Sequence, residues 1–222
     1  MKIATLNIQH GGGRRIAPII EFLKQLNADL IVLTEYHLDD KNLGKQLVEL
    51  GYQHQVAGST LPKENSVLIV SKEPFEVLSA SQRIVSVRLK ELVLFGVYFP
   101  QGDEKYPVYK KLKTEVKEAG SSVLVLGDFN TGLHYIDEAG KTFACADSFE
   151  SLKDVGLVDS WRTRHPAAKE FSWFSSQGNG FRIDHAFCSL LLNQDVSSIE
   201  YIPTPREMKI TDHSALAVVL KG

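Results

Sequence analysis

The sequence predicts an α/β protein in which β-sheets pack together beneath outer helices. Short apolar runs typical of buried strands, such as 30–33 and 123–126, alternate along the chain with segments of helical periodicity. Two further runs, 84–89 and 92–98, are separated by a short turn and are typical of a hairpin. A chain with both hairpins and helical crossovers favours packed sheets whose outer faces are covered by helices.

The strand candidates define these sheets. Each is either apolar throughout or alternates between apolar and polar residues, and turns rich in Gly, Pro, Asn and Asp separate them. Runs that are apolar throughout are expected to be buried on both faces. The candidates are 2–8, 30–34, 66–70, 84–89, 92–98, 123–126, 171–174, 182–187 and 215–220.

Helical periodicity is clearest in the segment 14–26. There Ile16, Ile19 and Leu23 recur at spacings of three and four, so that they form one apolar stripe along a helix. Because the helical segments lie between strands, each is expected to cover the face of a sheet. The other helix candidates are 39–50, 105–119 and 147–155.

Composition and charge exclude several classes of protein. With 43% hydrophobic and 23% charged residues, the chain is ordinary for a globular protein, and without a repeat or a linker residues 1–222 are expected to form a single domain and a monomer. A net charge of −2 argues against a strongly basic nucleic-acid-binding protein but allows a local basic face. No apolar run approaches the ~20 residues of a membrane helix, and the first residues lack the apolar core of a signal peptide, so we expect a cytoplasmic location and no membrane partner.

Acids, amides and a tyrosine lie at the ends of the apolar runs. Such residues are Asn7, Glu35, Tyr98, Asp128 and Asn130. Strand ends are where a rigid scaffold presents reactive groups. Carboxylate and amide oxygens are hard ligands that suit Mg²⁺ or Mn²⁺, and the sequence has no Cys-x-x-Cys or His-x-x-x-His pair for zinc.

A histidine with a carboxylate to orient it is the second component that hydrolysis requires. Asp212 and His213 immediately precede the last strand candidate. Neighbours in an extended segment point to opposite faces, so an acid from elsewhere is expected to orient His213. Asp184, in the candidate 182–187, is the obvious choice, and it leaves Asp212 free for a metal ion or water.

Six short motifs occur in an order that resembles a known superfamily. They are Leu6-Asn7-Ile8, Leu33-Thr34-Glu35, Tyr98-Phe99-Pro100-Gln101-Gly102, Gly127-Asp128-Phe129-Asn130, Arg182-Ile183-Asp184 and Asp212-His213-Ser214. The series resembles the endonuclease/exonuclease/phosphatase superfamily, and most closely the exonuclease III type of abasic-site endonuclease. This resemblance implies a four-layer α/β/β/α sandwich of the DNase I-like kind and metal-dependent hydrolysis of phosphate esters.

The resemblance also implies roles for individual residues. Glu35 matches the principal ligand of a Mg²⁺ or Mn²⁺ ion, Asn7 matches the amide beside it, and Asp212 matches an acid that reaches the metal region.

The catalytic roles follow in the same way. Asp128 matches the residue that positions or deprotonates the attacking water, and Asn130 matches the amide that steadies the substrate. Tyr98 matches the active-site tyrosine that assists phosphate binding or the leaving oxygen. Asp184 and His213 match the acid–histidine pair that stabilises the transition state.

A further stretch bears on the substrate. Trp173, Phe181 and Ile183 match the residues that line the apolar pocket for a flipped, base-less sugar in abasic-site endonucleases. Arg14 or Arg15, which follow a run of glycines, could contact phosphate. The sequence departs from the family pattern in two places. Its pocket segment is short, and Gln9 stands where the nuclease branch often has an acid. No role can be given to His10, His134 and His185.

Together these observations predict a Mg²⁺- or Mn²⁺-dependent phosphodiesterase, namely a DNA nuclease of the abasic-site endonuclease or 3′-exonuclease type. Direct attack by water is expected, because no Ser, Cys or Thr lies in a recognisable nucleophile motif. One alternative keeps the chemistry but changes the substrate to RNA, a nucleotide or a phosphorylated small molecule. Another is a binding protein that keeps the fold without catalysis.

Overall fold

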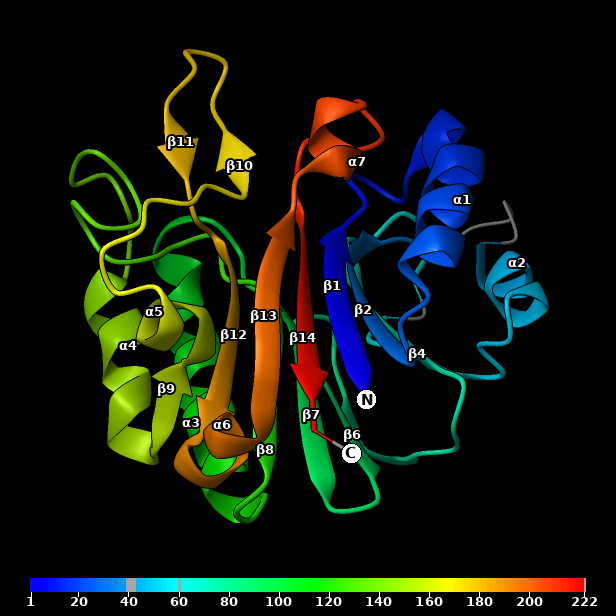
Figure 1. Ribbon diagram of the computed structural model, residues 1–222, viewed down its shortest axis with the longest axis horizontal. Helices are drawn as coiled ribbons and strands as arrows, with labels where there is room; N and C mark the ends of the chain where they lie inside the picture. The colour runs from blue at the N-terminus through cyan, green and yellow to red at the C-terminus, as the bar shows by residue number, and fades with distance from the viewer. Residues whose placement is uncertain (39–42, 60, 222) are drawn as a thin grey trace.

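Two six-stranded sheets lie face to face in the computed structural model, which describes residues 1–38, 43–59 and 61–221 (Figure 1). The first sheet has the strand order β13 (Val196–Ile202), β14 (Ala215–Leu220), β1 (Lys2–Asn7), β2 (Leu30–Tyr36), β4 (Ser66–Ser71) and β3 (His54–Ala57). The second has the order β5 (Glu76–Ala80), β6 (Ile84–Leu89), β7 (Leu92–Tyr98), β8 (Val123–Asp128), β12 (Asp184–Ser189) and β9 (Leu157–Asp159). A small hairpin, β10 (Trp173–Phe174) and β11 (Gly180–Phe181), projects beyond one end of the sandwich (Figure 1).

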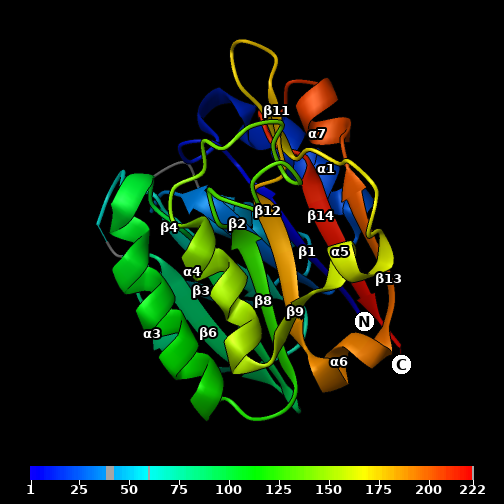
Figure 2. The ribbon, with the colours of Figure 1, turned by 90° about the vertical axis from the view of Figure 1, so that its left-hand side faces the viewer.

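Helices cover the outer faces of both sheets. Helices α1 (Ile16–Leu26) and α2 (Leu43–Glu49) pack on the first sheet, and α3 (Lys105–Glu118) and α4 (Ala146–Glu150) pack on the second (Figures 1 and 2). Three short helices lie at the ends of strands: α5 (Ser160–Arg164), α6 (Leu190–Asp195) and α7 (Thr204–Glu207). No helix in the described part of the chain is long and apolar enough to cross a membrane.

The main apolar core lies between the two sheets. Val32 and Ile69 from the first sheet share this core with Leu94 and Leu126 from the second. Gly96 in β7 allows a close approach, because a Cβ atom there would lie 3.0 Å from the side chains of Val32 and Val67. Separate cores lie under the helices of each outer layer. The four-layer α/β/β/α sandwich predicted from the sequence is therefore confirmed.

The boundaries of several predicted elements differ from the structure. Strands β2 and β8 run past their apolar residues, so that Glu35 and Asp128 lie within strands, and the candidate 171–174 is reduced to β10. Of the helix candidate 39–50, only α2 is observed, and 39–42 lie outside the described residues. The segment 147–155 divides into α4 and a 3-10 helix (Ser151–Val155). Strands β3, β5, β9 and β13 were not predicted, because they are short, polar or at sheet edges.

Two parallel strand pairs determine where reactive groups can gather. Strand β1 is parallel to β2, and β7 is parallel to β8, whereas the other neighbours in both sheets are antiparallel. A helix joins each parallel pair, α1 in the first sheet and α3 in the second. The carboxyl ends of the two pairs carry Asn7, Glu35, Tyr98 and Asp128. Strand β12 then begins with Asp184, directly opposite Asp128.

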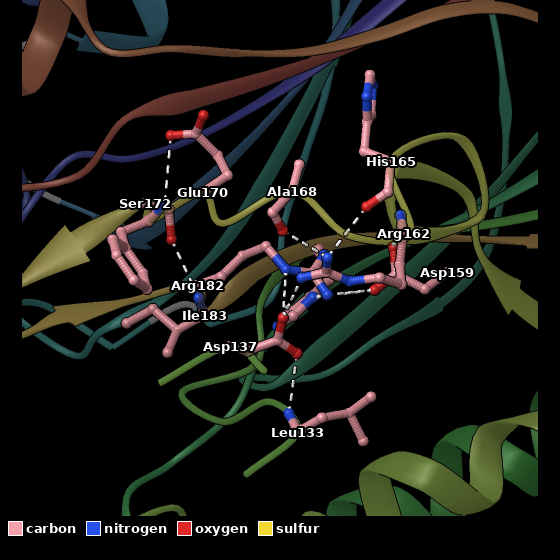
Figure 3. A network of polar contacts seen from close by, with 12 residues as sticks. Leu133, Asp137, Asp159, Arg162, His165, Ala168, Glu170, Ser172, Arg182 and Ile183 are labelled. Carbon is pink, nitrogen blue, oxygen red and sulfur yellow. Dashed lines mark hydrogen bonds and ion pairs between the residues drawn. The ribbon is translucent and has the colours of Figure 1, made fainter. Parts of the chain in front are cut away.

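A buried ion-pair network fixes the entry into β12 (Figure 3). Arg182 is fully buried, and its guanidinium donates to Asp137 Oδ1 at 2.7 Å and to Asp159 Oδ2 at 2.6 Å. Arg162 donates to the same Asp137 oxygen at 2.9 Å. The network thus joins the loop after β8, the strand β9 and the segment that carries Ile183 and Asp184.

The two carboxyl groups of this network are held ionised. Burial alone would raise the pKa of Asp137 and of Asp159, but the adjacent Arg182 guanidinium outweighs it and holds both pKa values below their usual range. Their contribution to stability is therefore fully present above about pH 4, the ordinary pKa of an aspartate. It is lost as the pH falls through the lowered pKa values of the folded state.

We expect the substitution Arg182→Met to lower the free energy of unfolding by roughly 3–5 kcal/mol, because it leaves two buried carboxylates without a cation. Urea denaturation would measure this loss. Arg88→Gln is the matched control, since Arg88 pairs with Glu76 at 3.3 Å on the exposed surface and should cost at most about 1 kcal/mol. Equal losses in the two variants would contradict the structural role of Arg182.

Candidate active site

Polar side chains from both sheets converge at one end of the sandwich. The first sheet supplies its residues from β1 and β2, the second from β7, β8 and β12, and the loop before β14 completes the set. All of the catalytic and metal-binding residues predicted from the sequence lie in this region. They are Asn7, Glu35, Tyr98, Asp128, Asn130, Asp184, Asp212 and His213.

Asn7 joins the two sheets at this site. Its amide nitrogen donates to Glu35 Oε1 at 3.1 Å and to Asp128 Oδ2 at 2.9 Å, so one fully buried side chain holds a carboxylate from each sheet. Its amide oxygen accepts from the backbone N–H of Gln9 at 2.8 Å. Asn7, which was predicted to contact a metal ion or water, therefore orients two carboxylates in this arrangement.

Glu35 is held in an unusual backbone conformation. Its φ angle is 55°, in the left-handed region, and the pairing of β2 with β4 shifts register at this residue. Left-handed φ angles are uncommon for residues other than Gly, Asn and Asp, and they cluster at functional sites. The bend turns the carboxylate out of the sheet, where its Oε2 atom accepts from the His10 N–H at 2.9 Å.

Asp128, Asp184 and His213 form a buried cluster whose ligand atoms all lie within 4.8 Å of one another. His213 Nδ1 lies 2.7 Å from Asp184 Oδ2. An acid from another segment therefore lies against the imidazole, as predicted. The backbone N–H of Asp184 donates to Ser172 Oγ at 3.1 Å. The second oxygen of Asp184 is buried and has no hydrogen-bond partner among the described residues.

The electrostatics of the cluster follow from this crowding. Burial and the negative charge of Asp184 raise the pKa of Asp128 to about 7. Burial alone would lower the pKa of His213, but the charges of Asp184 and Asp128 outweigh it and raise that pKa to about 10. At neutral pH His213 is therefore a buried cation, whereas Asp128 can exchange its proton.

The donor set fits a divalent cation. Carboxylates of Asp128 and Asp184 surround the positive charge of His213, Asn7 joins Glu35 to Asp128, and one buried oxygen of Asp184 has no hydrogen-bond partner among the described residues. Hard cations such as Mg²⁺ and Mn²⁺ take oxygen ligands of this kind. A protonated imidazole has no lone pair for a metal, so the cluster suits oxygen ligation. Asp212 lies beside this set, where its Oδ2 accepts from Trp173 Nε1 at 3.0 Å.

Tyr98 and Asn130 flank the carboxylates. Asn65 Nδ2 donates to the Tyr98 hydroxyl at 3.2 Å, and the Arg83 guanidinium lies 5.0 Å from the centre of the ring. Burial and the nearby Glu35 carboxylate raise the pKa of Tyr98 to about 12, so its phenol stays protonated. The Asn130 backbone N–H donates to Asp128 Oδ1 at 2.8 Å, and its side chain donates to the Phe99 carbonyl at 2.8 Å.

A cavity of about 620 Å³ opens beside these groups. Trp173, Phe181 and Ile183, the predicted pocket residues, line it together with Glu35 and His213. The rings of Trp173 and Phe181 have centroids 5.6 Å apart. The apolar wall and the carboxylates of Glu35 and Asp212 therefore line one cavity, which we call the main cavity.

Lys105 is a residue of the main cavity that the sequence analysis missed. It is the first residue of α3, only 1% of it is exposed, and burial lowers the pKa of its ammonium group. It stands after Asp103 and Glu104 in a charged segment, where a solvated lysine is the usual interpretation. Its place in the site depends on the direction in which α3 leaves the sheet, which no local pattern reveals.

The two arginines considered for phosphate contact, Arg14 and Arg15, have different surroundings. Arg14 is exposed and does not line the main cavity, whereas Arg15 is held in place by a hydrogen bond to the Gln9 carbonyl at 2.7 Å. The 3-10 helix Gly13–Arg15 turns the two side chains in different directions, so the second arginine faces the site region.

The three unassigned histidines have distinct surroundings. His10 Nδ1 lies 3.3 Å from Glu35 Oε2 at the edge of the site. His185 is buried, and its Nε2 lies 2.9 Å from the Thr131 carbonyl. His134 contacts Glu138 at 2.8 Å, in the loop after β8.

Comparison with known proteins gives consistent results. The sequence matches the Endonuclease/Exonuclease/phosphatase family over residues 4–213. A DNA-(apurinic or apyrimidinic site) endonuclease of Dictyostelium discoideum is 22% identical over 259 residues, which cover 99% of this chain and 70% of that protein.

Solved structures share the fold. An AP endonuclease from Archaeoglobus fulgidus superposes with a TM-score of 0.87 at 21% identity, and both chains are covered completely. The 3′ phosphatase NExo from Neisseria, bound to a product DNA hairpin, gives a TM-score of 0.86 at 22% identity, again over 100% of both chains.

We expect the affinity of the site for Mn²⁺ to fall as the pH drops below 7, because a metal ion and a proton compete for Asp128, whose pKa is raised to about 7. The fall approaches about tenfold per pH unit well below that pKa. Isothermal titration calorimetry between pH 5.5 and 8 would measure it. In the variant Asp128→Asn the same dependence should flatten, and an affinity that does not change with pH in the unaltered protein would contradict the prediction.

Proposed function

The chain belongs to the Endonuclease/Exonuclease/phosphatase family, whose members hydrolyse phosphate esters, and from this premise we propose that it is a divalent-metal-dependent DNA nuclease that incises DNA at abasic sites. We also propose that residues 1–222 act as one domain, because both sheets contribute to a common core. The partner of the enzyme is then a DNA strand with a missing base.

One observation carries the choice of substrate. The apolar wall of Trp173, Phe181 and Ile183 lines the same cavity as the Glu35 carboxylate and the His213 imidazole. A sugar without a base is compact, so it can enter such a space when it is turned out of the duplex. A normal nucleotide would have to place its base against the same wall.

A Mg²⁺ or Mn²⁺ ion would be held by Glu35 with oxygens of Asp128 and Asp184. When bound, such an ion supplies positive charge that polarises a phosphoryl oxygen. The contribution of Asn7 is to keep the carboxylates of Glu35 and Asp128 oriented toward one another.

The protein groups support direct attack by water. Asp128 can orient the attacking water and accept its proton, because the Asn130 N–H fixes the orientation of its carboxylate. His213, a cation oriented by Asp184, can donate to a phosphoryl oxygen and stabilise charge that develops there. The protonated Tyr98 phenol can donate to the phosphate or to the leaving oxygen.

A covalent route through a cysteine is disfavoured. Burial raises the pKa of Cys188 to about 11, and it also raises the pKa of Cys145. Both side chains are therefore neutral thiols near pH 7, whereas the thiolate is the nucleophilic form.

We expect the protein to incise an end-labelled duplex at a single abasic analogue, in the presence of Mg²⁺ or Mn²⁺ and not with a chelator. The variant Asp184→Asn should incise roughly 10²–10⁴-fold more slowly, because His213 then loses the charge that keeps it protonated and oriented. Asp195→Asn, at an exposed position at the end of α6, is the matched control and should incise at the normal rate.

The other outcomes are equally informative. Degradation of undamaged ends without incision at the lesion would keep the nuclease and remove the abasic pocket. Failure to act on either duplex would overturn the proposed substrate, and hydrolysis of bis(p-nitrophenyl) phosphate would then show whether the phosphodiesterase chemistry survives.

A further inference from the structure

A buried lysine lines the main cavity. Lys105, at the start of α3, is the one lysine among the described residues of the cavity lining, and only 1% of it is exposed. Its ammonium group forms no ion pair with a carboxylate within the described ranges 1–38, 43–59 and 61–221. Lysine is almost never fully buried unless it is paired, because burying an isolated charge is costly. An unpaired, buried amine at a reactive cavity therefore indicates a functional group.

The local packing holds Lys105 at the cavity. Its backbone N–H donates to the Gly102 carbonyl, which also accepts from Cys145 Sγ at 3.7 Å. Cys145 directly follows Thr142–Ala144, a part of the loop after β8 that lines the same cavity. The first turn of α3 is thus joined to another segment of the cavity wall.

Aromatic rings continue from this loop to the apolar wall. The rings of Phe143 and Phe181 have centroids 5.7 Å apart, and those of Phe181 and Trp173 have centroids 5.6 Å apart. Lys105 and the apolar wall therefore belong to one continuous lining. A sugar held against this wall, as proposed above, shares its space with the amine of Lys105.

Burial also changes the chemistry of this amine. Desolvation lowers the pKa of the Lys105 ammonium group, although the nearby charges of Asp128 and Asp103 oppose the shift. At neutral pH a larger share of Lys105 is therefore the neutral amine than in an exposed lysine. The neutral amine is the nucleophilic form, and desolvated lysines form Schiff bases with carbonyl substrates.

An abasic sugar offers such a carbonyl group. Without a base, C1′ of the deoxyribose carries a hydroxyl, and opening of the ring converts this carbon into an aldehyde. A nucleotide that keeps its base has no aldehyde, because the base occupies C1′. The proposed substrate thus differs from normal DNA in the one group that an amine attacks.

We propose that Lys105 Nζ attacks C1′ of the ring-opened abasic sugar and forms a Schiff base, which gives the protein a second, metal-independent way to cleave the strand. This inference rests on the abasic substrate proposed above. It goes beyond hydrolysis at the carboxylate cluster, because it uses a different protein group and breaks a different bond.

The reaction requires no oxidant or reductant. The neutral amine adds to the aldehyde carbon, and the resulting carbinolamine loses water to give a protonated imine. The imine withdraws electrons, so a proton leaves C2′ for water, and its electron pair forms the C2′–C3′ double bond. The C3′–O3′ bond breaks, and the phosphate leaves as the 5′ end of the downstream strand. Water then hydrolyses the imine, which releases an unsaturated aldehyde and restores Lys105.

The test compares two duplexes of the same sequence, both with a chelator present. One has a natural abasic site, made by enzymatic removal of uracil, and the other has a tetrahydrofuran analogue, which cannot form an aldehyde. Sodium cyanoborohydride reduces an imine to a stable secondary amine. A denaturing gel should therefore show a protein–DNA adduct with the natural site alone, and peptide mass spectrometry should place it on Lys105. Without the reductant, only the natural site should be cleaved.

Two variants separate the amine from its charge. Lys105→Met removes the amine at similar volume, and Lys105→Arg keeps a positive charge without a nucleophilic amine. Both should lose the adduct and the chelator-resistant cleavage, while a cooperative urea transition shows that each is folded. Lys110→Met is the matched control, because Lys110 is exposed on the same helix, and it should keep both.

The possible failures can be told apart. If the unaltered protein incises the analogue with Mg²⁺ but gives no adduct at the natural site, this inference falls while the proposed nuclease stands. An adduct of normal yield in Lys105→Met or Lys105→Arg would assign the chemistry to another group and overturn the inference. If the adduct forms on Lys105 but the analogue is not incised with any metal ion, the proposed hydrolysis falls and this inference stands. Without adduct and without incision, both fall.

Discussion

The buried Arg182 guanidinium, shared between Asp137 and Asp159, is the interaction on which the reactive end of the molecule depends. Burying a charge is costly unless it is paired and hydrogen-bonded, so the three segments that meet at Arg182 cannot move apart independently. The next residues along the chain are Ile183, in the apolar wall, and Asp184, the partner of His213. A structural ion pair thus sets the positions of both the pocket wall and the acid–histidine pair.

The site itself is an interface between two halves. Each sheet contributes one parallel strand pair, and neither pair alone brings enough polar groups together for chemistry. Asn7 links the two pairs, because its amide donates to a carboxylate from each sheet. The pKa of Asp128 is raised because burial, and then repulsion by the Asp184 carboxylate, favour its protonated form. The repulsion is a local cost that the surrounding cores offset.

The sequence predicted the fold class, the family and most of the residues at the site, and the reasons are local. Runs such as Leu30–Leu33 and Val123–Leu126 are continuous and apolar, and Glu35 and Asp128 each stand two residues after the end of a run. The unpredicted features arise from long-range packing. Arg182 belongs to one of the six motifs, but its partners Asp137 and Asp159 lie 45 and 23 residues away in the sequence. No local sequence pattern predicts these pairs. The same holds for Lys105, which faces the site only because α3 crosses from β7 to β8 as it does.

The crowded carboxylates also couple the fold to its surroundings. A site that is electrostatically unfavourable when empty gains free energy when a cation enters, and that gain belongs to the folded state alone because unfolding disperses Glu35, Asp128 and Asp184 along the chain. By mass action, an ion at a hundred times its dissociation constant would add about 2.7 kcal/mol to the folded state. With the proposed metal binding, the melting temperature of the protein would rise with the divalent-ion concentration, and measurements of its stability should state that concentration.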